Sequence, residues 1–243
     1  MNALTREKVV TPLSQGTFGH MAGLAQRWSR HRTLPFVKKR DSWLDVLVLE
    51  WVSIPLTRAL ARTFLTPTQV SIISIAGKII AAALFWDGQL RYGAAAWIVA
   101  VLLDGVDGKL ARLTGKVSEQ GARLDYSADF SLFVVLVLAL ASGSDVSMFL
   151  AAVCAGTGIA SALATSDNDL ARKSDVDSRS IWDRLTAEAG MVPYPGVLEI
   201  QFLLLFLAPV VGATAVTIAM LVSTAYFTAA WMAKIIFLGR IHS

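Results

Sequence analysis

Six long apolar stretches follow one another along the chain from residue 66 onward, and most are separated by clear polar turns. A helix needs about 20 residues to cross the roughly 30 Å of a bilayer's hydrocarbon, and the stretches are close to that length. The last two are divided only by Pro209 and Gly212. The pattern predicts an all-α integral membrane protein with six transmembrane helices, at 66–86, 91–112, 120–142, 145–165, 196–212 and 213–237.

The first of these helices has a well-defined start in the sequence Thr66-Pro67-Thr68-Gln69. Thr66 is suited to cap the helix, Pro67 to occupy its first turn, and Gln69 to reach back to the residue that caps it. Ahead of this start, residues 41–64 mix apolar residues with two tryptophans and end in two arginines. They predict an amphipathic juxtamembrane helix lying along the cytoplasmic interface. The alternative is one more partly buried segment of the bundle.

Composition supports a membrane protein, because 55% of the residues are hydrophobic, only 16% are charged and the mean hydropathy is +0.57. Ten of the 22 Lys and Arg residues lie in 1–65. Most of the others lie in two polar loops and at the end of the chain, so we expect both termini to be cytoplasmic in a multi-pass protein of the inner or plasma membrane.

We divide the chain into a basic cytoplasmic segment at 1–40, the juxtamembrane helix at 41–64 and a six-helix domain at 65–240. A single cysteine excludes an internal disulfide.

Four aspartates interrupt the second and third apolar stretches: Asp104, Asp107, Asp125 and Asp129. A charge at the centre of a membrane helix costs about 2.5 to 3.5 kcal/mol, so this cluster needs cations or water. Helical periodicity places each pair on one helix face. If the two helices form an antiparallel pair about a turn near Lys116, Asp107 faces Asp125 and Asp104 faces Asp129. We therefore predict two layers of carboxylates towards the cytoplasmic end of the bundle.

Carboxylate oxygens are the ligands that Mg²⁺ and Mn²⁺ prefer, and four aspartates are enough for two such ions. On the same face, Gly108 and Ala111 leave room for a ligand, and Arg112 offers a guanidinium for phosphate. A pair of divalent ions on a pyrophosphate stabilises the charge that develops when a phosphoryl group passes to a hydroxyl. The cluster therefore indicates phosphoryl transfer. A purely structural role, with the acids neutralised by Lys109, Arg112 and Lys116, is disfavoured because three cations cannot balance four acids and both lysines can extend to water.

The pattern Asp-x2-Asp-Gly-x2-Ala-Arg-x8-Gly-x3-Asp-x3-Asp resembles the signature of the CDP-alcohol phosphotransferase family. All eight of its positions are filled, by Asp104, Asp107, Gly108, Ala111, Arg112, Gly121, Asp125 and Asp129. The Thr-Pro start of the first helix is also similar, although the family usually has Asn after that proline and this chain has Thr68.

The resemblance implies a membrane transferase of phospholipid biosynthesis that moves a substituted phosphate from a CDP-linked donor to an acceptor alcohol and releases CMP. Asp104, Asp107, Asp125 and Asp129 would hold two Mg²⁺ or Mn²⁺ ions, with Asp129 also acting as the base. Gly121 would let the two helices approach each other closely. The family commonly forms homodimers, and we expect membrane lipids but no nucleic acid as partners. The donor pocket would be lined by Asp107, Gly108, Ala111 and Arg112.

The substrates are less sharply defined by the sequence than the chemistry. The donor is either CDP-diacylglycerol or a soluble CDP-alcohol, and the acceptor is a small alcohol or a phosphorylated alcohol. Lys78, Arg172 and Arg179 are candidates to bind a phosphorylated acceptor. For the arginines the alternative is ordinary charge bias of a cytoplasmic loop, and for Lys78 it is a side chain extended to the interface.

The competing function is a cation or metal transporter, because facing carboxylates inside a membrane also build ion carriers. Two features disfavour it. All four acids lie towards one membrane face, and the two halves of the chain show no inverted repeat.

Overall fold

The computed structural model of the chain describes residues 34–38, 41–163, 186, 191–192 and 195–239. It has two compact units, residues 1–39 and 40–243. The first unit corresponds to the predicted basic segment. Its described part contains a turn in which the Val37 N–H donates to the Leu34 carbonyl. Arg172 and Arg179 lie outside the described residues. Within the described parts of the second unit the regular structure is entirely helical, as predicted.

A helix or a continuous helical segment lies at each of the six predicted ranges. Three stretches are long and apolar enough to cross a membrane, Pro67–Trp86, Asp125–Gly143 and Ala213–Ala233, and two further apolar helices are shorter. These helices fit a membrane protein. That the chain crosses the membrane six times stays a prediction. The elements are α3 (Pro67–Trp86), α4 (Leu90–Thr114), α5 (Glu119–Gly143), α6 (Met148–Leu163), α8 (Val197–Phe202), η3 (Leu203–Leu207), α9 (Ala208–Val211) and α10 (Ala213–Gly239).

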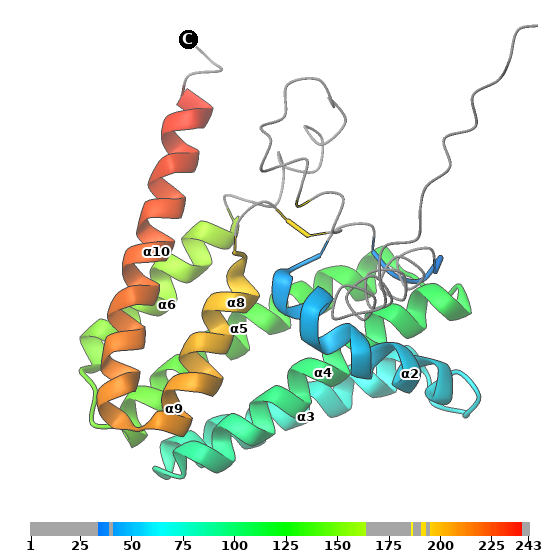
Figure 1. Cartoon of the computed structure of the whole chain (residues 1–243), viewed down its shortest axis with the longest axis horizontal. Helices are drawn as coiled ribbons and strands as arrows, with labels where there is room; N and C mark the ends of the chain where they lie inside the picture. Colours follow the sequence, from blue (N-terminus) through cyan, green and yellow to red (C-terminus); the bar gives the residue numbers. More distant parts are fainter. Residues whose placement is uncertain (1–33, 39–40, 164–185, 187–190, 193–194, 240–243) are drawn as a thin grey trace, which may run out of the picture. The chain divides into compact units, whose positions relative to one another are not determined.

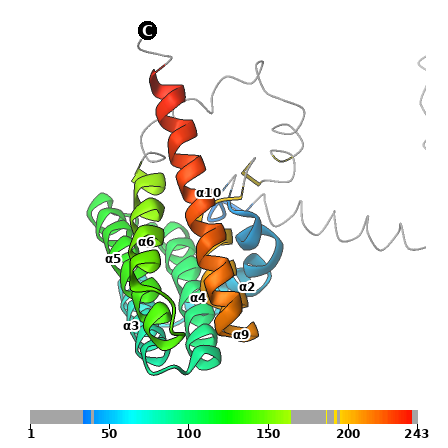
Figure 2. The ribbon, with the colours of Figure 1, turned by 90° about the vertical axis from the view of Figure 1, so that its left-hand side faces the viewer.

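The helices pack in a closed ring within the second unit (Figures 1 and 2). α4 packs on α3, α3 on α5, α5 on α6 and α6 on α10, and α10 contacts η3 and α9, which return to α4. The sequence predicted that α4 and α5 present their carboxylates to each other, and the meeting of Asp104 and Asp107 of α4 with Asp125 of α5 agrees with that prediction. Within the described residues α3 packs against both helices, which have little backbone contact with each other.

Small residues explain why α3 packs closely on α4. A Cβ added at Gly77 of α3 would lie 3.0 Å from the Cβ of Ala100 on α4, and both Ala81 and Ala100 are fully buried. Small side chains let membrane helices approach at their backbones. The buried face of α3 follows the four-residue spacing of a helical stripe, through Val70, Ser74, Lys78, Ala82 and Phe85.

Helix ends follow the residues that mark them in the sequence. The Gln69 N–H donates to Thr66 Oγ1 over 3.3 Å, and the Thr66 N–H donates to Gln69 Oε1 over 2.9 Å, which confirms the predicted capping box. Gly115 ends α4 with φ +67°, a conformation that glycine adopts without strain. α9 ends at Val211, directly before Gly212.

The juxtamembrane segment is helical through η1 (Asp45–Leu49), a π-helical turn, and α2 (Glu50–Leu60), and α2 packs against α4. Its polarity differs from that of a helix on a water-soluble protein. The exposed side is apolar, whereas acidic and hydroxyl side chains are buried against the bundle. Such a helix is suited to face lipid, although its position at the interface stays a prediction. The exposed apolar residues are Leu47, Val48, Trp51 and Val52, and the buried polar ones are Asp45, Glu50, Ser53 and Thr57.

An ion pair inside the protein ties this segment to α4. Lys109 Nζ lies 3.2 and 3.3 Å from the two carboxylate oxygens of Asp45, and Lys109 is only 3% exposed. The prediction that Lys109 extends to water is therefore wrong. Gly105 lies beside the pair, since a Cβ there would lie 3.6 Å from Lys109 Nζ and 3.7 Å from Asp45 Oδ1, which are ordinary contact distances. Burial raises the pKa of the Asp45 carboxyl, and the Lys109 ammonium opposes the rise.

We expect the substitution Asp45→Ala to lower the free energy of unfolding by about 3–5 kcal/mol, because it leaves the Lys109 ammonium buried without its partner. The double variant Asp45→Leu with Lys109→Met removes both charges and should stay close to the native stability. Thermal unfolding in detergent, followed by intrinsic fluorescence, measures both. Equal losses of stability in the single and double variants would show that the charge pair is not the cause.

Candidate active site

Three of the four predicted carboxylates come together between α4 and α5. Asp104 and Asp107 lie three residues apart on α4, Asp125 lies on α5, and one oxygen from each falls within 4.8 Å of the others. We call these three residues the carboxylate triad. Asp107 is 5% exposed, and the other two are partly buried. Three carboxylates this close repel one another unless a cation lies among them.

The triad fits a divalent cation on the evidence of its own atoms. Asp107 Oδ2 is buried and makes no hydrogen bond to any described group. A buried carboxylate oxygen without a partner costs free energy, and a metal ion removes that cost. The donor set consists of carboxylates only, which suits hard cations such as Mg²⁺ and Mn²⁺. This arrangement agrees with the sequence prediction of a metal site.

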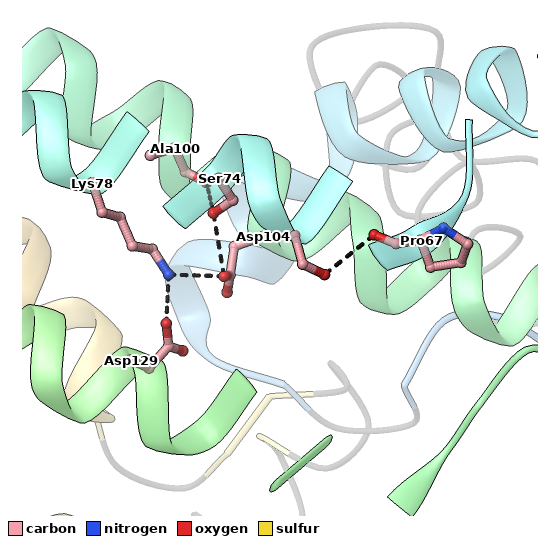
Figure 3. Close-up of polar contacts among 7 residues, drawn as sticks. Pro67, Ser74, Lys78, Ala100, Asp104 and Asp129 are labelled. Carbon is pink, nitrogen blue, oxygen red and sulfur yellow. Dashed lines mark hydrogen bonds and ion pairs between the residues drawn. The ribbon is translucent and has the colours of Figure 1, made fainter. Parts of the chain in front are cut away.

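The fourth carboxylate, Asp129, is bound by a lysine from a third helix (Figure 3). Lys78 Nζ lies 2.5 Å from Asp129 Oδ1 and 2.8 Å from Asp104 Oδ1. Lys78 is 5% exposed, so its ammonium does not reach the interface as the alternative interpretation required. The ammonium instead joins α3, α4 and α5 at one point. Asp129 keeps a side chain that is 45% exposed, compared with 26% for Asp104.

A serine one helical turn before Lys78 adds to this contact. The Ser74 hydroxyl donates to the Ala100 carbonyl over 2.9 Å and lies 3.4 Å from Asp104 Oδ1 (Figure 3). Sequence analysis did not assign a role to Ser74. The available signal is two polar residues spaced four apart, at 74 and 78, on one face of a mostly apolar helix.

The four carboxylates lie at two different distances from the ends of α4 and α5 that the connecting turn joins. Asp104 lies ten residues before the end of α4 at Thr114, and Asp129 lies ten residues after the start of α5 at Glu119. At 1.5 Å per residue this is about 15 Å from the helix ends. Asp107 is three residues nearer to that end, and Asp125 is four residues nearer. The two layers stay a prediction from helix position, while in the structure Asp104 lies in the triad and also shares Lys78 with Asp129.

Arg112 folds back over the smallest residue of the motif. A Cβ added at Gly108 would lie 3.6 Å from Arg112 Nη1 and 4.0 Å from Nη2, so the guanidinium occupies the space that a larger residue would take. Ala111, directly before Arg112 on the same helix, is partly buried. Gly121 lies in α5, but its surroundings fall outside the described side chains. The roles of Gly108, Ala111 and Arg112 in a donor pocket stay predictions.

A model of the CDP-alcohol phosphatidyltransferase family matches residues 64–233, which is more than two thirds of the chain. The chain belongs to this family. The match runs from the start of α3 into α10 and contains all eight signature positions. As a CDP-alcohol phosphatidyltransferase the protein is a transferase, and the carrier alternative has no support in the comparison.

Two curated relatives are similar over shorter segments. A phosphatidylinositol phosphate synthase of Mycobacteroides abscessus is 40% identical over 77 residues, 31% of this chain and 34% of the relative. A protein of Rubrobacter xylanophilus named bifunctional IPC transferase and DIPP synthase is 38% identical over 85 residues, 35% of this chain and 20% of the relative. The chain therefore matches about a third or less of each relative's length.

The fold is similar to that of a solved structure. Crystal structures of Mycobacterium tuberculosis phosphatidylinositol phosphate synthase superpose with a TM-score of 0.53 over 76% of this chain, at 20% and 21% sequence identity. The superposition covers 87% of that protein in its complex with manganese and citrate and 92% in the form with CDP-DAG bound. At this identity the likeness establishes the fold. The family's divalent-metal chemistry agrees with the triad found in this chain.

Proposed function

We propose that this transferase moves the phosphatidyl group of CDP-diacylglycerol to the hydroxyl of an inositol phosphate and releases CMP. The carboxylate triad is the observation that carries the proposal, because Asp107 has a buried oxygen free for a cation and the family signature lies on the same residues. The named activities of the M. abscessus and M. tuberculosis relatives support the choice of substrates.

The reaction exchanges one phosphorus–oxygen bond for another. The acceptor hydroxyl oxygen forms a bond to the phosphorus that carries diacylglycerol, and the bond from that phosphorus to the oxygen shared with CMP breaks. CMP leaves with the bonding electron pair. The hydroxyl proton passes to a base, for which Asp129 is suited because its side chain is the more exposed of the two carboxylates on Lys78.

Asp104, Asp107 and Asp125, with Asp129 beside them, would hold two divalent cations, which supply stabilisation of the negative charge on the diphosphate. The remaining groups are positioned to hold substrates. Arg112 carries a guanidinium suited to phosphate oxygens, and this guanidinium lies beside Gly108. Gly108, Ala111 and Arg112, together with Asp107, would line the nucleotide pocket. We assign to Arg172 and Arg179 the role of binding the phosphorylated acceptor. The role of Lys78 is to bind the carboxylates that it contacts.

The deciding experiment measures CMP release by the purified protein in lipid nanodiscs. CDP-diacylglycerol is offered with inositol phosphate, glycerol phosphate, serine or free inositol, with Mg²⁺ and with excess EDTA. We expect CMP only with a metal ion and fastest with inositol phosphate. CMP release that is faster with another acceptor would overturn the assigned acceptor alone. No CMP with any of these acceptors, or CMP release unaffected by EDTA, would overturn the proposed reaction.

A further inference from the structure

The buried lysine Lys78 lies between the carboxylate triad and the fourth carboxylate, Asp129. Asp104 belongs to the triad, yet its Oδ1 is bound by Lys78 Nζ at 2.8 Å. Asp129 falls outside the triad, and its Oδ1 is bound by the same ammonium at 2.5 Å. A second cation shared by Asp104 and Asp129 would lie in this place or directly beside the ammonium, on the carboxylate oxygens that Lys78 does not contact. The ammonium therefore performs, in the structure, the electrostatic task of a second ion.

We infer that Lys78 is a resident cation of the active site, which limits the nucleotide-free enzyme to one tightly bound divalent ion. The inference rests on the proposed function and concerns how this chain loads its metals. The first ion goes to the triad, where Asp107 offers an oxygen without a partner. The second ion is held weakly until the donor's diphosphate arrives, because until then it would lie beside an ammonium of like charge.

Charge and burial support this assignment. Lys78 is 5% exposed, so water screens its charge less than at a surface, although the side chain of its partner Asp129 is 45% exposed. Repulsion between a divalent ion and an ammonium a few ångströms away is strong under such conditions. A bound diphosphate adds negative charge on the other side of the ions and offsets the repulsion. The flexible four-carbon stem of a lysine allows the ammonium to shift towards a phosphate oxygen.

A merely structural lysine would tie α3 to α4 and α5 without affecting how many ions bind. The number of ions per chain therefore separates the two roles. Ser74 provides the independent tie between α3 and α4, through the Ala100 carbonyl at 2.9 Å, so the helices keep one polar contact when Lys78 is replaced.

The test counts bound Mn²⁺ by equilibrium dialysis and electron paramagnetic resonance, with and without CDP, against a blank of CDP without protein. We expect native protein to bind one Mn²⁺ tightly without CDP and two with it. The Lys78→Met variant should bind two Mn²⁺ ions without CDP. Its dissociation constant for the second ion should be at least tenfold lower than that of native protein. Lys78→Arg keeps the charge and should match native protein. Lys116→Met changes an exposed lysine at the turn between α4 and α5 and serves as the matched control.

Two tight Mn²⁺ ions on native protein without CDP, or an unchanged second dissociation constant in Lys78→Met, would overturn the inference while leaving the proposed function intact. Native protein that binds no Mn²⁺ even with CDP would overturn the metal chemistry itself. If Lys78→Met does not elute as a folded species on size exclusion, Lys78→Gln is counted in its place under the same criteria.

Discussion

Asp129→Asn is expected to slow CMP release by about 10²–10⁴-fold, the usual contribution of a general base. Asparagine has nearly the same shape and still accepts a hydrogen bond from Lys78, but it cannot take the proton of the acceptor hydroxyl. The first Mn²⁺ should bind as in native protein, because the triad of Asp104, Asp107 and Asp125 does not include Asp129. The measurement is the turnover number with saturating CDP-diacylglycerol and acceptor, together with a Mn²⁺ titration.

The matched control for this prediction is Asp87→Asn, which changes an exposed aspartate directly after the end of α3, away from the site. It should turn over at the native rate. A native rate in Asp129→Asn would show that another group accepts the proton. A loss of the first Mn²⁺ in the same variant would show instead that Asp129 belongs to the first metal site.

Gly143→Ala is expected to prevent the accumulation of folded protein. Gly143 ends α5 against the turn that joins α3 to α4, and a Cβ there would lie 1.7 Å from the Phe85 carbonyl oxygen and 3.0 Å from the Gly88 nitrogen. Both neighbours are backbone atoms, so no side chain can move aside. Overpacking of a fitted interior costs about 1–3 kcal/mol and more where the backbone must shift, and this contact is far shorter than any van der Waals distance.

The control variant is Gly156→Ala on α6, where an added Cβ meets no atom within 4 Å. In a helix interior, alanine is favoured over glycine by about 0.5–1 kcal/mol, so this variant should be as stable as native protein or slightly more so. Yield of monodisperse protein on size exclusion and the midpoint of thermal unfolding compare the two. A Gly143→Ala protein with native yield and midpoint would contradict the close approach of α5 to the α3–α4 turn.

Features set by neighbouring residues could be predicted from the sequence. The start of α3 at Thr66 and the break between α9 and α10 at Gly212 depend on residues within one turn, and both are as expected. The spacing of Asp104, Asp107 and Asp125 predicts a shared site because helical periodicity fixes which side chains lie on one face. The family signature lies on these residues and so was visible in the sequence.

Features set by the choice of packing partner could not be predicted in the same way. Periodicity shows that Lys78 and Ser74 share a face, but not that this face meets both α4 and α5. The spacing about the turn predicts that α4 faces α5, but not that α3 packs closely against both of them. The pairing of Lys109 with Asp45 spans 64 positions in the chain and depends on where the juxtamembrane helix docks.

The order in which the chain is made gives the Lys78 contact a second consequence. Lys78 leaves the ribosome before Asp104, and Asp104 before Asp129. If α3 and α4 cross the membrane as the sequence predicts, inserting them together would pair Lys78 with Asp104 and avoid part of the cost of about 2.5 to 3.5 kcal/mol that each isolated charge would carry. The residue that prepares the site for its metals would thus also ease the passage of the acidic helices into lipid during biogenesis.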